Sequence, residues 1–201
     1  MPDQLPQCSG LTDNNGNPSG VLTMEPGEYC VAYNSNPTAL TDQEKENLKK
    51  ELTGIQSPSF EGYENYKGGT SSLSDFKGKY VYVDVWATWC GPCIKQIPFL
   101  STLEKEYHNK NIAFVSISTD ESRRSGGSWD AAENKWKKFV KAKQLTGTQL
   151  WAGQDYSFQQ AYQINSIPRF ILIDPKGNIV DANAPRPADP RLKEIFTSLG
   201  I

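Results

Sequence analysis

Long apolar runs and positively charged tracts are missing from this chain. None of its 201 residues lies in a stretch that approaches the roughly 20 apolar residues of a membrane-spanning helix. The formal net charge is -2, so neither nucleic acid nor an anionic membrane surface is indicated as a partner. The first ten residues lack the charged and then apolar order of a signal peptide. If the natural protein is exported, we expect its signal to have been removed.

Histidine and cysteine, the usual zinc ligands, are scarce. The single histidine is His108, and the four cysteines form one close pair, Cys90 and Cys93, and two isolated positions, Cys8 and Cys30. The close pair could be half of a zinc site, but no second close pair completes four ligands. We therefore expect no metal and no organic cofactor. Cys8 and Cys30 could form a disulfide over a loop-rich segment, or Cys30 could be a buried free thiol.

The chain changes character near residue 56. The N-terminal part is rich in Gly, Pro, Asn and Asp, which is typical of loops. Thr41 stands three residues before Glu44, the spacing of a capping box, and predicts a helix over about 41–53. We therefore predict a loop-rich N-terminal extension over residues 1–55 and one α/β domain over residues 56–201.

The larger part alternates between strand and helix patterns. Residues 80–87 and 112–117 are β-branched and aromatic runs, typical of strands buried on both faces. Between them Phe99, Leu103 and Tyr107 repeat at helical spacing, which predicts a βαβ unit with parallel strands. Further predicted elements are a helix from Trp129 to Val140, a strand at 148–151, a helix near 158–162, a hairpin of 170–174 with 178–181, an exposed loop at 120–127, and a last helix capped by Asp189. The pattern predicts an α/β sandwich with a mixed sheet.

A cysteine pair opens the first helix of this unit, in the sequence Trp89-Cys90-Gly91-Pro92-Cys93. Thiolates attack disulfides, and the N–H groups at a helix start stabilise such an anion. Two intervening residues bring Cys93 around one turn to face Cys90, and Pro92 fits a first turn whose N–H groups have no helical partners. The spacing predicts an attacking thiol and a resolving thiol. A structural disulfide, or a degenerate domain that only binds partners, is the alternative.

The stretch 83–93 resembles the active-site strand and helix start of thioredoxins, and 166–174 resembles their later cis-proline segment. From about residue 57 to the C-terminus the chain is similar to the TlpA/ResA family of extracytoplasmic thioredoxin-like proteins, including an extra helix and strand over 129–151. The resemblance implies a three-layer thioredoxin-like sandwich and a thiol–disulfide oxidoreductase with a CGPC site. It also implies disulfide-containing protein substrates, a membrane-embedded thiol donor and a place in the bacterial periplasm.

Several site residues follow from the resemblance. Pro168 matches the family's cis-proline, and with Ile167 it should offer backbone to an extended substrate segment. Taken alone, Pro168 would be an ordinary proline at a strand start. Trp89, Gly91 and Pro92 should border the substrate.

Asp84 matches the buried aspartate of thioredoxins. Burial should raise its pKa, and Asp84 could then take the proton of Cys93 during the second step. A strand-edge acid bonded to water is the alternative. ResA-like members often carry a glutamate three residues after the second cysteine, whereas Gln96 stands here and cannot titrate. If a carboxylate assists the reaction, Asp84 must supply it.

The predicted reaction is the reduction of protein disulfides, with Cys90 attacking and Cys93 resolving the mixed disulfide. The Gly-Pro spacer is the one found in reducing thioredoxins, which favours this direction. A peroxiredoxin-like thiol peroxidase is the rival enzyme, although a peroxidatic cysteine usually lacks so close a partner. A non-catalytic binding module is the rival outside enzymes.

Overall fold

A computed structural model gives the fold and describes residues 22–23, 29–30, 43, 47 and 50–201. The chain divides into two compact units, Met1–Ala39 and Leu40–Ile201. In the first unit, strand β1 (Leu22–Thr23) pairs antiparallel with strand β2 (Tyr29–Cys30). Among the described residues, no helix is long and apolar enough to cross a membrane.

Predictions about the N-terminal part are tested only in places. Every described position from 43 to 52 is helical and Thr53 is in a turn, in agreement with the helix predicted over about 41–53. The remaining positions of that range lie outside the described residues. Cys8 and the side chain of Cys30 also lie outside them, so a bridge between the two stays a prediction. The boundary between residues 55 and 56 likewise stays a prediction.

The segment after this helix runs along the last hairpin of the sheet. The Gly54 N–H donates to the Ile179 carbonyl at 2.7 Å, and the Ile179 N–H donates to the Ile55 carbonyl at 2.8 Å. The Ser57 N–H donates to the Gly177 carbonyl at 2.8 Å. Leu52 packs against the main core. Backbone pairing and apolar contact therefore join this segment to the α/β domain.

The domain is built on one mixed sheet of seven strands in the order β4-β3-β7-β6-β5-β8-β9. The strands are β3 (Tyr63–Asn65), β4 (Thr70–Ser71), β5 (Tyr80–Trp86), β6 (Ile112–Ser118), β7 (Thr148–Trp151), β8 (Arg169–Ile173) and β9 (Ile179–Asp181). Strands β5, β6 and β7 are parallel, and the remaining pairs are antiparallel. The predicted parallel pair and the hairpin at the end are confirmed, while the β3–β4 hairpin was not predicted.

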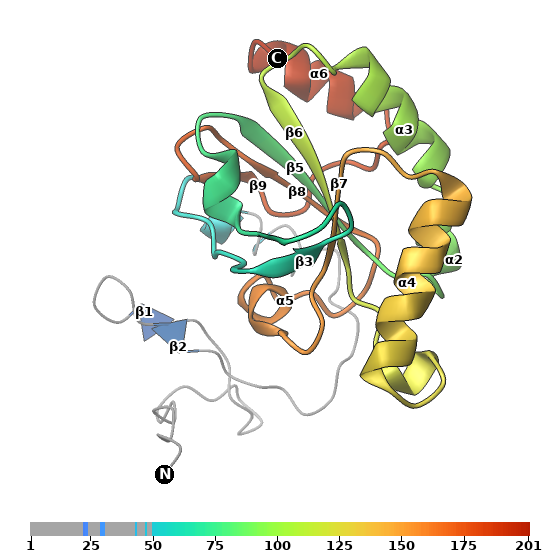
Figure 1. The fold of residues 1–201 in the computed structure, drawn as a ribbon. Helices are drawn as coiled ribbons and strands as arrows, with labels where there is room; N and C mark the ends of the chain where they lie inside the picture. Colours follow the sequence, from blue (N-terminus) through green and yellow to red (C-terminus); the bar gives the residue numbers. More distant parts are fainter. Residues whose placement is uncertain (1–21, 24–28, 31–42, 44–46, 48–49) are drawn as a thin grey trace. The chain divides into compact units, whose positions relative to one another are not determined.

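Helices cover both faces of this sheet (Figure 1). They are η1 (Leu73–Phe76), α2 (Gly91–Ile94), α3 (Ile97–Glu106), η2 (Ser122–Arg124), α4 (Trp129–Lys143), α5 (Ser157–Ala161) and α6 (Arg191–Ser198). The crossovers from β5 to β6 and from β6 to β7 run the same way across the sheet, and right-handed connections then place their helices on one face. Accordingly α3, α4 and α6 lie on one side and α5 on the other.

The central strand β5 sends its side chains alternately to these two faces. Val81, Val83 and Val85 belong to the core that α5 completes. Tyr82 belongs to the core under α3 and α6, and Trp86 to the cluster under α4. Asp84 lies between Tyr82 and Trp86 in this alternation, so its carboxyl faces the side of the sheet that α3, α4 and α6 cover.

The predicted first helix is broken in two. Helix α2 ends at Ile94, and α3 begins at Ile97 with Pro98 in its first turn, as expected where proline cannot continue a helix. Phe99, predicted on the apolar face, is 50% exposed, whereas Leu100 is 7% exposed. Phe99, Leu103 and Tyr107 all follow the break, and each step of four residues drifts by about 40° around a helix. Phe99 therefore falls at the edge of the face that buries Leu100, Leu103 and Tyr107.

Candidate active site

Cys90 and Cys93 stand at the start of α2 and are joined by a disulfide bond. Their sulfur atoms are 1.97 Å apart and their Cα atoms 5.2 Å apart. Cys90 is the residue before the first helical position, and its sulfur accepts a hydrogen bond from the Cys93 N–H at 3.2 Å. Both residues are buried. An N–H directed at the Cys90 sulfur is a donor that stabilises a thiolate once the bond is reduced.

The other motif residues form the exposed border of this pair. Gly91 and Pro92 are exposed, and Trp89 is 37% exposed. The Arg124 guanidinium lies over the Trp89 ring, 4.2 Å from its centroid, which is the geometry of a cation–π contact. Trp89, Gly91 and Pro92 are thus open to solvent beside Cys90, and their contact with a substrate stays a prediction.

The segment 166–174 lies beside the dithiol, as the resemblance implies. The Ile167–Pro168 peptide bond is cis. The half-buried Ile167 packs against the cluster that contains Cys90 and Cys93. Arg169 then begins β8, which pairs with β5. The structure thus brings the two predicted motifs together, while the role of Ile167 and Pro168 toward a substrate stays a prediction.

The loop that carries Cys90 is held by a buried acid, Asp120. The Asp120 carboxylate accepts hydrogen bonds from the Thr88 N–H at 2.9 Å, from the Thr88 hydroxyl at 2.6 Å and from the Ser118 hydroxyl at 2.8 Å. The Asp120 carbonyl accepts from the Trp151 indole N–H at 3.1 Å. Asp120 is 0% exposed, so the loop predicted as exposed over 120–127 does not include this residue, whereas Arg123, Arg124, Gly126 and Gly127 are exposed as predicted. Three donors compensate the burial of its charge.

Asp84 lies in the middle of β5, opposite Ser116 of β6 and Phe170 of β8. It is 7% exposed, and its Oδ1 is buried without a hydrogen-bond partner among the described residues. Burial, and secondly the negative charge of Glu104 on α3, raise the pKa of Asp84 from 3.8 to about 8. A pKa near neutrality suits a group that accepts and releases a proton at physiological pH.

Gln96, which stands where related proteins often have a glutamate, has a structural contact. Its side-chain oxygen accepts a hydrogen bond from the Ala188 N–H at 3.2 Å. It therefore joins the break between α2 and α3 to the loop before α6. Across the part of the chain that the structure describes, no three His, Cys, Asp or Glu side chains gather into a metal site.

Three residues of this region were not singled out from the sequence. Asp120 stands two residues after the end of β6, at the carboxyl end of a parallel strand, where functional side chains collect, so a signal for it existed. The packing of η2 places Arg124 over Trp89, and the packing of α3 lets the charge of Glu104 act on Asp84. No local pattern marks either one.

Comparisons with known proteins agree with this geometry. The family model described as Redoxin matches residues 52–196. The thiol-disulfide oxidoreductase ResA of Bacillus subtilis (strain 168) is 30% identical over 127 residues, which are 63% of this chain and 64% of ResA. The thioredoxin-like protein YneN of the same organism is 33% identical over 136 residues, 66% of this chain and 74% of YneN. This chain thus spans slightly less than two thirds of ResA.

Solved structures show the same fold. The solution structure of a candidate thiol-disulfide oxidoreductase from Bacteroides vulgatus is 46% identical, covers 73% of this chain and 89% of its own, and has a TM-score of 0.61. The crystal structure of the thioredoxin domain of a thiol-disulfide oxidoreductase from Bacteroides vulgatus is 30% identical, covers 73% and 96%, and has a TM-score of 0.62. The predicted fold class is confirmed, and the names of these proteins agree with the predicted enzyme class. The chain therefore belongs to the Redoxin family, as a ResA/TlpA-like member of the thioredoxin superfamily.

Proposed function

We propose that this protein is a thiol–disulfide oxidoreductase that reduces disulfide bonds of protein substrates through Cys90 and Cys93. One observation carries the proposal: the two cysteines are bonded at the start of α2, with the Cys93 N–H on the Cys90 sulfur. The exposed Gly91 and Pro92 leave the motif open to a partner. Such an arrangement favours exchange between a bonded and a reduced form over a purely structural cross-link.

The reaction moves two electrons from the dithiol to the substrate. The Cys90 thiolate attacks one substrate sulfur, and the other substrate sulfur leaves as a thiolate with the electron pair of the broken bond. Cys93 then gives its proton to the Asp84 carboxylate through water and attacks the Cys90 sulfur. The bond between Cys90 and the substrate breaks, and the second substrate sulfur leaves. The enzyme ends with the Cys90–Cys93 bond seen in this structure.

The oxidised pair has to be reduced again before another turn. The resemblance to extracytoplasmic TlpA/ResA proteins supports a membrane-embedded thiol donor for this step and a place in the bacterial periplasm. The half-buried Ile167 beside the dithiol cluster supports the addition of an extended substrate segment at Ile167–Pro168.

Trapping separates the roles of the two cysteines. Cys93→Ser should accumulate covalent mixed disulfides with substrate proteins, because Cys90 still attacks and no thiol resolves the product. Cys90→Ser is the matched control and should trap none. Non-reducing gels and insulin reduction measure both. If neither variant loses insulin reduction, the roles are wrong, and turnover of a hydroperoxide without any disulfide substrate would indicate a peroxidase instead.

A further inference from the structure

A row of buried polar side chains crosses the sheet at Asp84. Asp84 of β5 is the register partner of Ser116 of β6, and Ser116 is the partner of Gln149 of β7. Because these strands are parallel and their side chains alternate, all three side chains point to the face under α3 and α4. They are 7%, 3% and 4% exposed. Buried polar groups without partners lower the stability of the fold. A row of them across three central strands therefore indicates a functional role.

Four polar atoms around this row are buried without a hydrogen-bond partner among the described residues. They are Asp84 Oδ1, Gln149 Oε1, Trp86 Nε1 and Trp136 Nε1. The two oxygens can accept a hydrogen bond, and the two indole N–H groups can donate one. Trp86 and Trp136 belong to one cluster, which also holds the dithiol. Buried polar atoms are nearly always bonded to protein or to ordered water, so donors and acceptors gathered in this way suit a chain of bound water.

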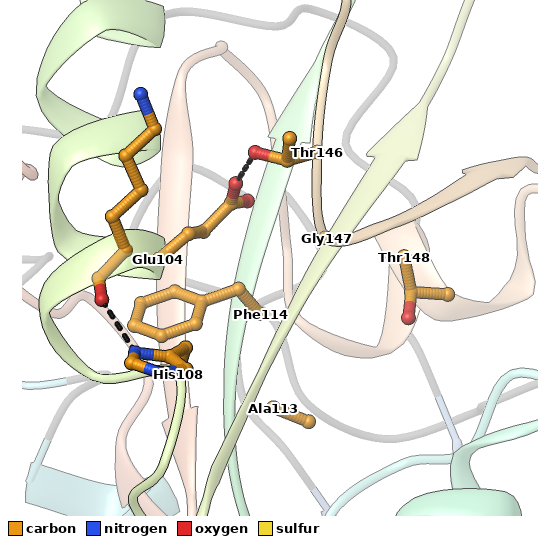
Figure 2. A pocket seen from close by; sticks show the side chains of 8 residues that line it. Glu104, His108, Ala113, Phe114, Thr146, Gly147 and Thr148 are labelled. Atoms are coloured by element: carbon orange, nitrogen blue, oxygen red, sulfur yellow. Dashed lines mark hydrogen bonds between the residues drawn. The ribbon is translucent and has the colours of Figure 1, made fainter.

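The row continues to a pocket beside the C-terminal half of α3 (Figure 2). The Gln149 Nε2 donates to the Thr146 carbonyl at 2.7 Å, and the Thr146 hydroxyl donates to the Glu104 carboxylate. A Cβ on Gly147 would come 2.5 Å from Glu104 Oε1, so only glycine lets the carboxylate lie this close to the start of β7. The cavity measures about 500 Å³, and its lining is completed by Lys105, His108, Ala113, Phe114 and Thr148.

This pocket and the dithiol lie at opposite ends of the parallel strands. Ala113 and Phe114 line the pocket and stand at the beginning of β6. Cys90 follows the end of β5. Parallel strands begin at the same end of a sheet, and β5 and β6 are parallel. A protein docked over Cys90 therefore leaves the pocket at Glu104 open to water.

We propose that this polar row is the route by which the proton accepted by Asp84 reaches solvent, with Glu104 at its outer end. The inference rests on the proposed role of Asp84 as the base for Cys93. Once Cys93 has lost its proton, its thiolate forms the bond to Cys90 and the substrate sulfur leaves with the electron pair. The proton on Asp84 then passes along water held by Ser116 and Gln149 to Glu104 and into bulk solvent. A docked substrate protein blocks direct release of the proton to solvent at the dithiol. While the substrate is bound, the proton leaves through the polar row instead.

The charges around the route act on one another. Burial raises the pKa of Glu104, while the hydrogen bond from Thr146 and the charge of Lys67 lower it. The charge of Glu104 in turn helps to raise the pKa of Asp84. The titratable groups that face the route and its pocket are Glu104 and Lys105 of α3, His108 in the turn after α3, Lys67 of the turn after β3, Tyr82 of β5, and the two cysteines.

Two substrates of different size test the route. Insulin is a protein and should exclude water from the dithiol face when it binds, whereas the small molecule oxidised glutathione should leave this face accessible to water. In single-turnover measurements with reduced protein at neutral pH, Gln149→Leu should slow the reaction with insulin several-fold more than the reaction with oxidised glutathione. Ser116→Ala removes a single oxygen and should shift the ratio of the two rates in the same direction, which keeps the test valid if Gln149→Leu does not fold. A merely structural defect would slow both substrates equally.

Charge removal at the outer end gives a second readout. Glu104→Gln removes the negative charge that opposes ionisation of Asp84, so the pH midpoint of the resolution step should move to lower pH. Glu106→Gln is the matched control, because Glu106 lies on the same helix but pairs with Lys193. It should leave both the midpoint and the ratio of the two rates in place.

The outcomes distinguish the route from the role of Asp84. A rate ratio that stays at the wild-type value in both Gln149→Leu and Ser116→Ala overturns the route. A pH midpoint that Glu104→Gln does not move shows that the charge of Glu104 does not act on Asp84, and this overturns the place of Glu104 at the outer end. If Asp84→Asn leaves both rates at the wild-type value, the base itself is wrong. If Asp84→Asn slows both substrates while the row variants keep the ratio, only the exit route fails.

Discussion

The perturbed acid Asp84 leads to a stability prediction that can be worked through in numbers. Its ordinary pKa is 3.8 and its pKa in the folded, oxidised protein is about 8. Between these values the folded protein keeps a proton that the unfolded chain has released. The stability linked to this proton is fully present below about pH 3.8 and is lost as the pH rises to about 8. Within this window each pH unit removes about 1.4 kcal/mol from the free energy of unfolding.

The perturbation is Asp84→Asn, which cannot titrate. Between roughly pH 5 and pH 7, Asp84 alone should lower the wild-type free energy of unfolding by about 3 kcal/mol. The variant lacks this loss, so its stability relative to wild type should rise by about 3 kcal/mol over the same interval. Chemical denaturation of both oxidised proteins at the two pH values measures it. Comparing the pH dependence of the two proteins cancels the titrating groups that do not interact with Asp84.

Asp130→Asn is a suitable control, because Asp130 is exposed at the start of α4. Its stability should follow that of the wild type across the interval. Parallel pH dependence of wild type and Asp84→Asn would refute the reasoning, since it would mean that Asp84 ionises in the folded protein as readily as in the unfolded chain.

Two further predictions concern the surroundings of the dithiol. Asp120→Ala leaves the buried Thr88 N–H and hydroxyl without their acceptor and should lower the free energy of unfolding by roughly 3 kcal/mol; a loss below about 1 kcal/mol in a denaturant titration would contradict the hydrogen bonds described. Arg124→Ala uncovers one face of the Trp89 ring and should increase quenching of tryptophan fluorescence by acrylamide, whereas Arg123→Ala should not; equal quenching in both variants would show that Arg124 does not cover the ring in solution.

Local motifs account for what could be predicted from the sequence. Cys90 and Cys93 lie within one turn of chain, and the segment around Pro168 is contiguous, so their patterns are readable without tertiary structure. The alternation of β-branched runs with helical spacing likewise led to the correct fold class. Phe99 was misplaced because a step of four residues drifts around the helix, which leaves Phe99 at the edge of the face that buries Leu100 and Leu103. The spacing alone does not show where that face is centred.

The rest depends on strand register, which the sequence does not display. Asp84, Ser116 and Gln149 are far apart along the chain and become neighbours only because three strands align. Glu104 reaches this row through a close approach at Gly147, which requires the final packing of α3 against β7. The buried role of Asp120 was missed because two of its three donors come from Thr88, on another loop.

The clamp at Asp120 has a consequence for the kind of partner that this enzyme can accept. Thr88 donates two hydrogen bonds to the Asp120 side chain, and the Asp120 carbonyl accepts one from Trp151. The segment before the dithiol is therefore held to the ends of β6 and β7. A segment held in this way cannot move outward to reach a disulfide buried below the surface of a substrate protein. We therefore expect the substrate to supply the conformational change. Disulfides in flexible, unfolded or extended segments would react, and those buried in a folded core would not.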